Sequence, residues 1–389
     1  MTVAVDRPGR RRLGRSLLDA GVLRPEWEVT FATVDRAMFL PHVMWPWDMT
    51  SRACNRVDKA ADADTWHAAA DTDQPIVTQW DDGRHTGPGP GTTATSSSSM
   101  PSVVYRLLGD LDVDEGMHVL DNGTGTGETA GALTHRCGSD KVTTIEIDAA
   151  ASRQAAQRLN ASGLHPTVVV GDGTAGYPAC GPYDRILVTY GLREVPGALV
   201  GQTRPGGLIV APWGTHYSNA DAVVRLTVQG TTASGRFTSG VEFMKSRNQR
   251  RTAINPSNYV PPEGVRGADT SRTSITEEQF ASGRFGVLPF VLGIRVQDCA
   301  QAVAAKREGS RPIWFYGLSD RSWACVLFRD GQAEARVWQS GPRRLWDEAE
   351  TAYHWWAAQG CPGFDRFGLT VTPDGQQVWL DEPTNFWSV

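Results

Sequence analysis

Short apolar runs alternate with amphipathic stretches between residues 101 and 213. Strands are predicted at 117–120, 142–147, 168–170, 185–188 and 208–210, and helices at 103–111, 129–133 and 149–159. Strands that alternate with helices imply right-handed crossovers and a parallel sheet. Antiparallel strands at 223–229 and 235–244 are expected to close the edge of that sheet. The pattern therefore predicts an α/β fold.

The residues before this region divide into a helical part and a loop-rich part. Leu13 and Leu17 fall at helical spacing, so helices are predicted within the first fifty residues, with Pro41 as a stop. Residues 81–91 are rich in glycine and proline and predict a loop, which the serines at 96–99 extend. A flexible linker and a binding loop or lid are both compatible with a loop of this length.

The chain after residue 244 differs again in its pattern. A hairpin is predicted at 322–338, where Asp330-Gly331 suits a type I′ turn, and a helix at 344–359 precedes a second hairpin at 370–380. Eight of the fourteen tryptophans lie in this part, and we expect most of them in its core. The predicted domains are a helical segment with a long loop at 1–95, a parallel-sheet domain at 96–244 and an α+β module at 245–389.

Composition and charge narrow the classes of function. Hydrophobic residues make up 40% of the 389, enough for a large core, and the formal charge of -5 argues against a general nucleic-acid binder. No apolar run approaches the roughly 20 residues of a spanning helix, so no membrane insertion is expected. Six scattered cysteines suit a reducing cytosol, and eight histidines without ligand spacing predict no metal site. The basic residues at 10–15 lack a following apolar segment, which favours a cytoplasmic location over export.

The segment most informative about chemistry is the glycine-rich stretch at 119–127, Val-Leu-Asp-Asn-Gly-Thr-Gly-Thr-Gly. It reads as a strand, a turn and a helix start, the place where open α/β sheets bind ligands. Glu128 stands where a dinucleotide fingerprint has its third glycine, and its carboxylate would repel a pyrophosphate. No Lys-Ser or Lys-Thr pair follows, so a P-loop is also excluded. A nucleoside without phosphates remains, and S-adenosylmethionine is the common case.

Two acidic residues at successive strand ends support a nucleoside site. Glu146 lies 23 residues past Gly123 and is placed to accept both ribose hydroxyls. Asp172, in Gly171-Asp172-Gly173, is placed to accept a hydrogen bond from the adenine amino group. The structural alternatives are a solvated strand end for Glu146 and a turn cap for Asp172.

With these motifs in order, residues 99–244 resemble protein-L-isoaspartate (D-aspartate) O-methyltransferases. The matching blocks are Ser99-Met100-Pro101, the turn from Leu120 to Gly127, Ile145-Glu146, Gly171-Asp172-Gly173, Tyr183 to Thr189, Glu194-Val195-Pro196 and Pro205 to Pro212. The resemblance implies a Rossmann-like class I methyltransferase that uses S-adenosyl-L-methionine. It places the active-site serine at Ser99. It places the cofactor contacts at Asp121, Gly123, Thr124, Gly125, Gly127, Glu146, Asp172 and Gly173.

The sequence departs from the family pattern in three places. Asn122 replaces an aliphatic residue usual in the turn, and residues 51–95 are longer and unlike the repair enzymes. The family pattern ends near residue 244, whereas this chain continues to residue 389. Such an extension is similar to that of homologues associated with ribosomal peptide natural products. That resemblance implies methylation of an aspartate in a cyclised precursor peptide, followed by aspartimide formation, with residues 245–389 recognising the peptide.

Methyl transfer to a carboxylate needs positioning more than acid–base catalysis, because the acceptor is already ionised at neutral pH. Ser99 is expected to orient the acceptor or the cofactor, while an N-cap of the helix beginning at Pro101 is the structural alternative for Ser98 and Ser99. The predicted substrate contacts are Ser98, Thr189, Tyr190 and Arg247. Arg247 belongs to the basic stretch 245–251, which would attract an acidic peptide or form a solvated loop.

Three hypotheses follow from the sequence. The leading one is a peptide-aspartate O-methyltransferase with a cyclised precursor peptide as partner, and without nucleic-acid or membrane partners. The second is an isoaspartate repair methyltransferase. The third is a peptide-binding scaffold with a degenerate methyltransferase domain, for which Asn122 is the warning sign. The oligomeric state stays open.

Overall fold

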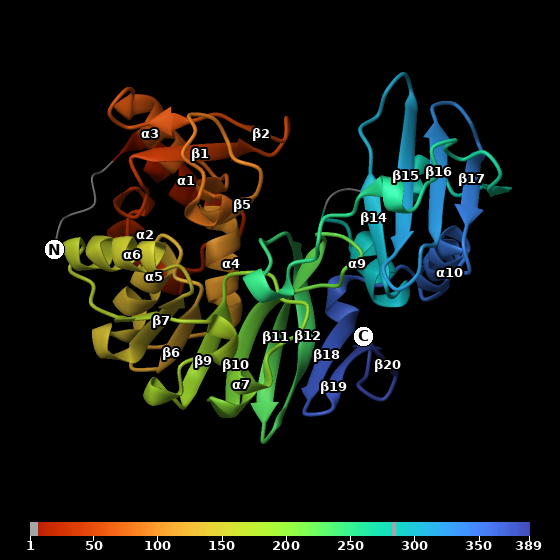
Figure 1. Cartoon of the computed structure of the whole chain (residues 1–389). Coiled ribbons are helices and arrows are strands. Elements are labelled where there is room, and N and C mark those ends of the chain that lie inside the picture. Colours follow the sequence, from red (N-terminus) through yellow and green to blue (C-terminus); the bar gives the residue numbers. More distant parts are fainter. Residues whose placement is uncertain (1–6, 282–284) are drawn as a thin grey trace. The chain divides into compact units, whose positions relative to one another are not determined.

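The computed structural model describes residues 7–281 and 285–389, and the chain forms two compact units (Figure 1). Unit 1 contains residues up to Tyr190 together with Pro196–Ala211 and Arg225–Ser234. Unit 2 contains Gly191–Val195, Pro212–Val224 and Gly235–Val389. Unit 2 thus includes two segments that precede residue 235 in the sequence. The three domains of the sequence analysis, with boundaries at 95 and 244, stay a prediction.

The core of unit 1 is a parallel sheet. Its strands are β6 (Val119–Asn122), β7 (Val142–Glu146), β8 (Thr167–Val170), β9 (Tyr183–Val188) and β10 (Thr203–Trp213). They lie in the order β10-β9-β6-β7-β8, and every pair along this order is parallel. The central strand is buried on both faces, since Val119, Leu120 and Asp121 are all inaccessible to solvent. The predicted parallel α/β sheet is confirmed.

Helices cover this sheet as the alternating pattern predicts. α4 (Pro101–Leu111) packs on β9, α5 (Glu128–Cys137) packs on β6 and β7, and α6 (Ala149–Ala161) packs on β7 and β8 (Figure 1). Asp148 caps α6, because its carboxylate accepts hydrogen bonds from the amides of Ala150 and Ala151. The short helix α7 (Gly197–Gly201) precedes β10. Each helix therefore begins just after the end of a strand, where the candidate site residues lie.

The N-terminal part of unit 1 forms a smaller antiparallel sheet with helices. Its elements are α1 (Pro8–Asp19), α2 (Glu28–Thr33), β1 (Val43–Asp48), β2 (Ala53–Cys54), β3 (Val57–Asp58), α3 (Ala63–Ala70), β4 (Ile76–Trp80) and β5 (Ala94–Ser98). The prediction that serines 96–99 extend a loop was wrong for 96–98, because β5 pairs with β4. Cross-strand hydrogen bonds outweigh the weak strand preference of serine. Residues 81–91 do form a loop, closed by the Asp81 carboxylate, which accepts from the amides of Thr92 and Thr93 at 3.0 and 2.7 Å.

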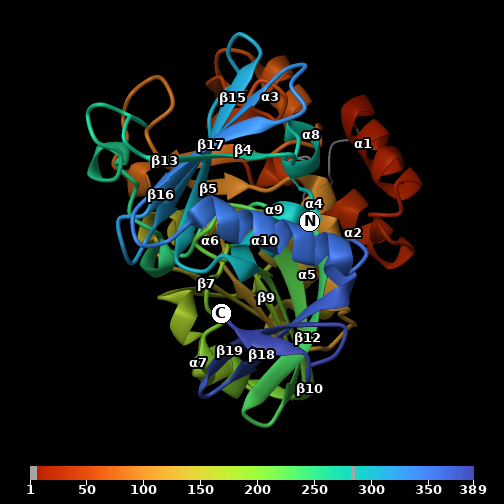
Figure 2. The same cartoon turned by 90° about the vertical axis from the view of Figure 1, so that its right-hand side faces the viewer.

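Unit 2 contains a five-stranded antiparallel sheet in the order β13-β17-β16-β15-β14. The strands are β13 (Asp269–Thr273), β14 (Cys299–Val303), β15 (Ser310–Gly317), β16 (Trp323–Arg329) and β17 (Ala335–Ser340). α10 (Leu345–Ala358) packs across β15–β17 and against α9 (Val287–Arg295), as Figure 2 shows. α8 (Glu277–Phe280) and the strands β18 (Phe367–Thr372), β19 (Gly375–Leu380) and β20 (Phe386–Ser388) complete the unit. β11 (Asp221–Gln229) and β12 (Thr232–Val241) are divided between the two units.

Two expectations for the C-terminal part meet different outcomes. The hairpin of β16 and β17 is confirmed, but its type I′ turn was wrong. That turn needs a positive φ at both central residues, and only Gly331 has one, whereas Asp330 does not. Of the eight tryptophans expected mostly in the core, three are buried and five half-buried, so fewer than half lie fully in the core. In the part of the chain described, no helix has the length and apolar character needed to cross a membrane.

Candidate functional site

The glycine-rich turn follows β6 and depends on conformations that favour glycine. Gly123 has a φ of 114° and Gly125 a φ of 53°. A Cβ at Gly123 would lie 2.5 Å from Oγ1 of Thr189, whose hydroxyl donates to the Gly123 carbonyl at 2.7 Å. The turn is therefore held against the end of β9. Thr189, predicted to contact substrate, also has this structural role.

Glu146 is bound directly to the turn. Its Oε2 accepts a hydrogen bond from the Gly125 amide at 2.9 Å, and its Oε1 accepts one from the Asp148 amide at 3.1 Å. The side chain is half-buried rather than a solvated strand end. A carboxylate has about four lone-pair sites, so both oxygens can still accept further hydrogen bonds. Glu146 is thus fixed in place with acceptor capacity left.

Asp172 lies at the exposed end of the next strand. Its Oδ1 accepts from the amide and the hydroxyl of Thr174 at 2.9 and 2.8 Å, which caps the short helix η5 (Gly173–Ala175). Its Oδ2 accepts no hydrogen bond from the described residues. The turn cap foreseen as an alternative is therefore present, and it leaves one oxygen for a ligand.

Asn122 links three parts of this site. Its Nδ2 donates to the Gly173 carbonyl at 2.7 Å, and Tyr190 Oη donates to its Oδ1 at 3.0 Å. A Cβ on Gly173 would overlap that same Oδ1. Burial raises the pKa of the Tyr190 phenol, which keeps it protonated as a donor at neutral pH. The residue that departs from the family pattern therefore connects β6, the Asp172-Gly173 turn and Tyr190.

Asp121 is fully buried in β6. Its Oδ2 accepts from Thr144 Oγ1 at 2.7 Å, its Oδ1 has no hydrogen-bond partner, and Thr144 also bonds Thr124 Oγ1 at 2.7 Å. Burial raises the pKa of Asp121 to about 7, and the Glu146 charge adds to this while the Thr144 hydrogen bond opposes it. The predicted cofactor contacts Asp121 and Thr124 are thus joined through Thr144 in the support of the turn.

The Ser98–Ser99 segment is held by a buried arginine, Arg36. Arg36 Nε donates to Ser98 Oγ at 2.8 Å, and its Nη2 donates to the carbonyls of Ser98 and Ser99 at 3.0 and 2.9 Å. Ser98 Oγ in turn donates to Glu128 Oε2 at 2.8 Å. Burial raises the pKa of Glu128, while the Arg36 charge opposes that rise. The predicted substrate contact Ser98 therefore has its hydroxyl engaged inside the protein.

Ser99 differs from Ser98. The N-cap of α4 is Met100, without a side-chain cap, and Asp73 instead accepts from the Ser102 amide at 2.9 Å. The N-cap alternative for Ser98 and Ser99 was therefore wrong. The Ser99 hydroxyl is half-buried and makes no hydrogen bond with any described residue. This hydroxyl is available to a ligand.

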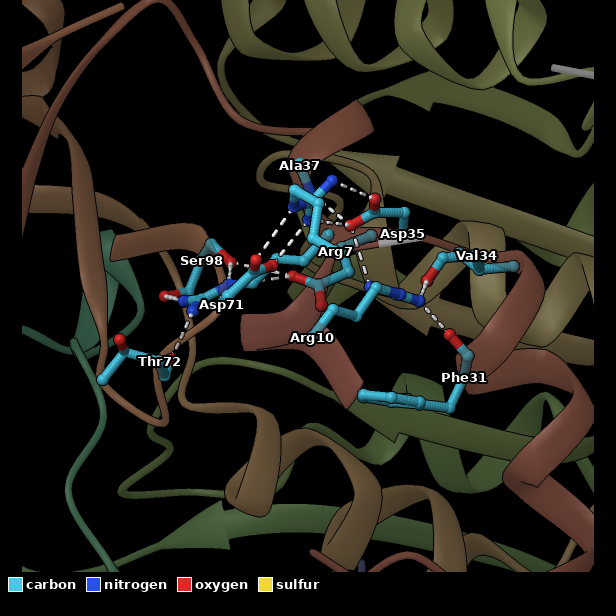
Figure 3. Close-up of polar contacts among 11 residues, drawn as sticks. Arg7, Arg10, Phe31, Val34, Asp35, Ala37, Asp71, Thr72 and Ser98 are labelled. Atoms are coloured by element: carbon cyan, nitrogen blue, oxygen red, sulfur yellow. Dashed lines mark hydrogen bonds and ion pairs between the residues drawn. The ribbon is translucent and has the colours of Figure 1, made fainter. Parts of the chain in front are cut away.

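A second charged cluster fixes the segments around Arg36 (Figure 3). Arg7 donates to Asp35 at 2.8 Å and to Asp71 at 2.6 Å, and Arg10 donates to Asp35 at 2.8 Å. Burial alone would raise the pKa of Asp35, but the Arg7 hydrogen bond and the Arg10 charge hold it below its ordinary value. Arg36 itself donates to the carbonyls of Thr72 and Gln74. The cluster ties the turn that carries Arg36 to the loop that accepts its hydrogen bonds.

A cavity of about 260 Å³ lies beside the turn. Gly125, Thr126 and Ser96 line one side, Trp45 and Trp80 form an aromatic wall, and Arg158 supplies a charge. A Cβ at Gly125 would lie 3.6 Å from the Ser97 carbonyl, so the serine segment borders the turn. Open space therefore exists next to the glycines.

The structure brings most of the predicted site residues into unit 1, at the carboxyl ends of β6–β9. Arg247 is half-buried in η7 (Arg247–Gln249) of unit 2. Sequence reasoning missed Arg36. The available signal was a charged pair, Asp35-Arg36, between apolar residues of a short helical stretch. Nothing in the sequence indicates that Arg36 reaches residues sixty positions later.

Comparison with known proteins finds relatives of the central segment. Residues 62–247 match the family model Protein-L-isoaspartate(D-aspartate) O-methyltransferase (PCMT). The match takes in every predicted cofactor residue and slightly less than half of the chain. The protein-L-isoaspartate O-methyltransferase of Rhodospirillum rubrum is 42% identical over 33% of this chain and 58% of its own length. That of Methanococcus maripaludis is 44% identical over 30% of this chain and 55% of its own length.

The chain thus spans between half and two thirds of the length of these curated relatives. A solved structure named protein-L-isoaspartate O-methyltransferase aligns with 96% of this chain and 100% of its own, at a TM-score of 0.52 and 19% identity. This likeness concerns the fold alone. Together with the family match, it confirms the Rossmann-like class I methyltransferase fold. The description of residues 245–389 as a separate α+β module stays a prediction.

Proposed function

We propose that this protein is an S-adenosyl-L-methionine-dependent O-methyltransferase that acts on an aspartate-derived carboxylate in a peptide or protein. The observation that carries the proposal is Glu146, bound to the Gly125 amide at 2.9 Å within the segment that matches the family model. An acid fixed on a glycine turn at a strand end suits a ribose with free hydroxyls. The names of the relatives favour the same activity.

The chemistry of the site fits a nucleoside without phosphates. Glu146 and Asp172 Oδ2 offer acceptors to hydroxyl and amino groups, and the apolar side chains of Ile147 and Val170 are 44% and 54% exposed beside them. Glu128 occupies the first turn of α5, where a phosphate would otherwise find backbone amides. When bound, the cofactor supplies a methyl group activated by a positively charged sulfur.

The protein's part in the reaction is to position the acceptor and exclude water. Glu146 and Asp172 would hold the cofactor, which would supply its methyl group to a carboxylate oxygen as its carbon–sulfur bond breaks, and would leave as S-adenosylhomocysteine beside the methyl ester. We assign the Ser99 hydroxyl to one oxygen of the acceptor carboxylate, which leaves the other oxygen to attack. No proton is transferred in this step, so no general base is needed.

The finer assignment concerns the substrate. We favour an aspartate in a cyclised ribosomal precursor peptide, whose ester closes to an aspartimide when the next backbone nitrogen displaces methanol. The support is the long continuation of the chain after residue 244, which makes up most of unit 2. Repair of isoaspartyl residues is the second candidate, favoured by the names of the relatives.

The deciding experiment supplies the full-length protein and cofactor with either an isoaspartyl peptide or the cyclised precursor encoded beside its gene. The favoured function predicts that the precursor gains the mass of one CH2 group and then loses methanol, ending one water lighter than it began. Methyl ester on the isoaspartyl peptide alone would instead establish repair. No mass gain on either peptide would support the scaffold hypothesis.

The cofactor site has its own test. Asp172→Ala removes the oxygen assigned to the adenine amino group, so cofactor affinity should fall about tenfold or more, as for the loss of a hydrogen bond to a charged group. Isothermal titration calorimetry measures this, and Asp140→Ala, an exposed carboxylate change, is the matched control. Equal affinities for the two variants would mean that the adenine lies elsewhere.

A further inference from the structure

In unit 2 a short loop, Gly191–Val195, is fixed by two glutamines. Gln249 Oε1 accepts from the Arg193 amide at 2.7 Å and from the Glu194 amide at 3.2 Å. Gln376 Oε1 accepts from the Val195 amide at 2.9 Å, and its Nε2 donates to the Arg193 carbonyl at 3.1 Å. The backbone that carries Arg193 is therefore held on both sides. Its side chain is placed by the fold rather than by a mobile loop.

The side chains of Arg193 and Arg251 are both unsatisfied. In each guanidinium, Nε and Nη1 are buried and have no hydrogen-bond partner. Neither side chain makes a hydrogen bond or an ion pair with any described residue. Each buried unpaired donor costs about 1–3 kcal/mol, more where the group is charged. Four such donors on two arginines indicate a missing acceptor.

Neighbouring charges do not supply that acceptor. Asp221 acts on Arg193 but makes no hydrogen bond to it: its Oδ2 is ion-paired with Lys245, and its Oδ1 is itself buried without a hydrogen-bond partner among the described residues. Among the described residues no carboxylate acts on Arg251, where Tyr259 and Cys299 contribute besides burial. Burial lowers the pKa of Arg193 to about 10, with the Asp221 charge opposing the shift and the Arg251 charge adding to it, so Arg193 keeps its charge at neutral pH.

His216 does not compensate these charges. Burial and the charges of Arg193, Arg251 and Lys245 lower its pKa to about 4, while Asp298 opposes them, so the imidazole is neutral at pH 7. Glu242 is a further acid nearby, and its charge acts on Lys245 and Asp221. The half-buried guanidinium groups of Arg193 and Arg251 thus remain without a hydrogen-bonded carboxylate among the described residues.

We infer that Arg193 and Arg251 form a subsite for a carboxylate of the substrate peptide, separate from the carboxylate that is methylated. A guanidinium presents paired N–H donors that match a carboxylate's two oxygens. Arg193 lies three residues after Tyr190, which follows the carboxyl end of β9. Ligands of open α/β sheets bind outside such strand ends. The inference rests on the proposed function and deepens it, because it assigns to the substrate an acidic residue in addition to the modified aspartate.

The test uses two versions of the substrate peptide, which differ at the residue next to the modified aspartate. One version has glutamate at that position and the other has glutamine. Wild type should show a KM about tenfold or more lower for the glutamate peptide, the magnitude of one charged hydrogen-bonded pair. Arg193→Met and Arg251→Met should each abolish that preference and leave the cofactor dissociation constant unchanged. Arg272→Met, at an exposed arginine paired with Glu334, should keep the preference.

The outcomes separate the two claims. Absence of methylation of both peptides by wild type would overturn the proposed function, whereas equal KM values would overturn only the subsite. A peptide with phosphoserine at the neighbouring position that binds better than the glutamate peptide would overturn the assignment to a carboxylate. The apparent melting temperature gives an independent readout. Both methionine variants should melt at or above the wild-type temperature, since each removes a buried unpaired charge, and a variant that unfolds would show the arginine to be structural.

Discussion

Arg36 in unit 1 and Arg251 in unit 2 show two opposite ways in which a protein buries a guanidinium. Arg36 is 3% exposed and donates to the Ser98 hydroxyl and to the carbonyls of Thr72, Gln74, Ser98 and Ser99. Arg251 has two buried nitrogens without any partner. A buried charge with its donors satisfied stabilises the fold around it, while one with unsatisfied donors indicates a ligand.

The difference follows from what surrounds each side chain. Arg36 faces two loops whose carbonyls point inward, and Glu128 lies 3.7 Å from its Nε. The groups that act on Arg251 are Tyr259 and Cys299, and its own charge acts on Arg193 and on the neutral His216. The first region therefore positions the Ser99 segment before any ligand arrives. The second gains its full set of hydrogen bonds only when an anion binds.

The largest expected effect is that of Arg36→Met. The change leaves Glu128 buried without its cation and several carbonyls without a donor, so the free energy of unfolding should fall by about 3–5 kcal/mol. Urea denaturation measures this change. Arg12→Met, at an exposed arginine of α1, is the control and should alter stability by less than about 0.5 kcal/mol. A loss for Arg36→Met no greater than for Arg251→Met would remove the contrast between the two regions.

Ser98→Ala and Ser99→Ala compare two neighbouring serines at the end of β5, one with its hydroxyl bonded inside the protein and one without. Ser98→Ala deletes the hydroxyl between Arg36 and Glu128 and should lower the free energy of unfolding by about 1–3 kcal/mol. Ser99→Ala should leave stability within about 0.5 kcal/mol of wild type and lower turnover about tenfold, since its hydroxyl bonds no described residue. Denaturation and methyl-transfer rates are compared for both. Equal losses of stability would show that Ser99 is structural too.

The smallest effect concerns Asp121, another buried polar group with an unpaired atom. Its pKa is raised from 3.8 to about 7, so the folded state binds the proton more tightly than the unfolded chain. Its contribution to stability is therefore complete below about pH 4 and is lost as the pH rises through about 7. Asp121→Asn should remove this loss.

Thermal melts between pH 4 and pH 8 measure this loss of stability. The difference in melting temperature between Asp121→Asn and wild type should grow with pH up to about 7. Asp140→Asn serves as the control, because Lys141 lowers the pKa of Asp140, so its contribution is lost only below about pH 4 and the difference from wild type should stay constant across this range. A constant difference for Asp121→Asn across the range would mean that Asp121 is ionised throughout in the folded protein.

Much of the fold follows from local pattern. The apolar runs of β6, β7 and β9 and the glycines after β6 predict the parallel sheet and its turn, because their signals lie within a few residues. β5 escaped prediction, since its serines form a strand only through pairing with β4. The type I′ turn failed for a similar reason, because the backbone at Asp330 is set by the strands it joins.

The candidate site also has a part that the sequence predicts and a part that depends on long-range contacts. Sequence spacing places Glu146 and Asp172 at strand ends, and the structure puts both at the edge where the turn lies. The supports of the site are long-range contacts. Asn122 meets Gly173 across 51 residues, and Arg36 meets Ser98 across 62. Periodicity carries no signal at such separations.

By itself the sequence determined the parallel sheet, the glycine turn and the acids that follow its strands, since backbone geometry links neighbouring residues directly. Only the tertiary structure decided which buried charges are satisfied. Whether a guanidinium buried in either unit finds carbonyls, a carboxylate or no partner depends on loops distant in the chain, and on the hydrogen-bonding groups that folding brings to it.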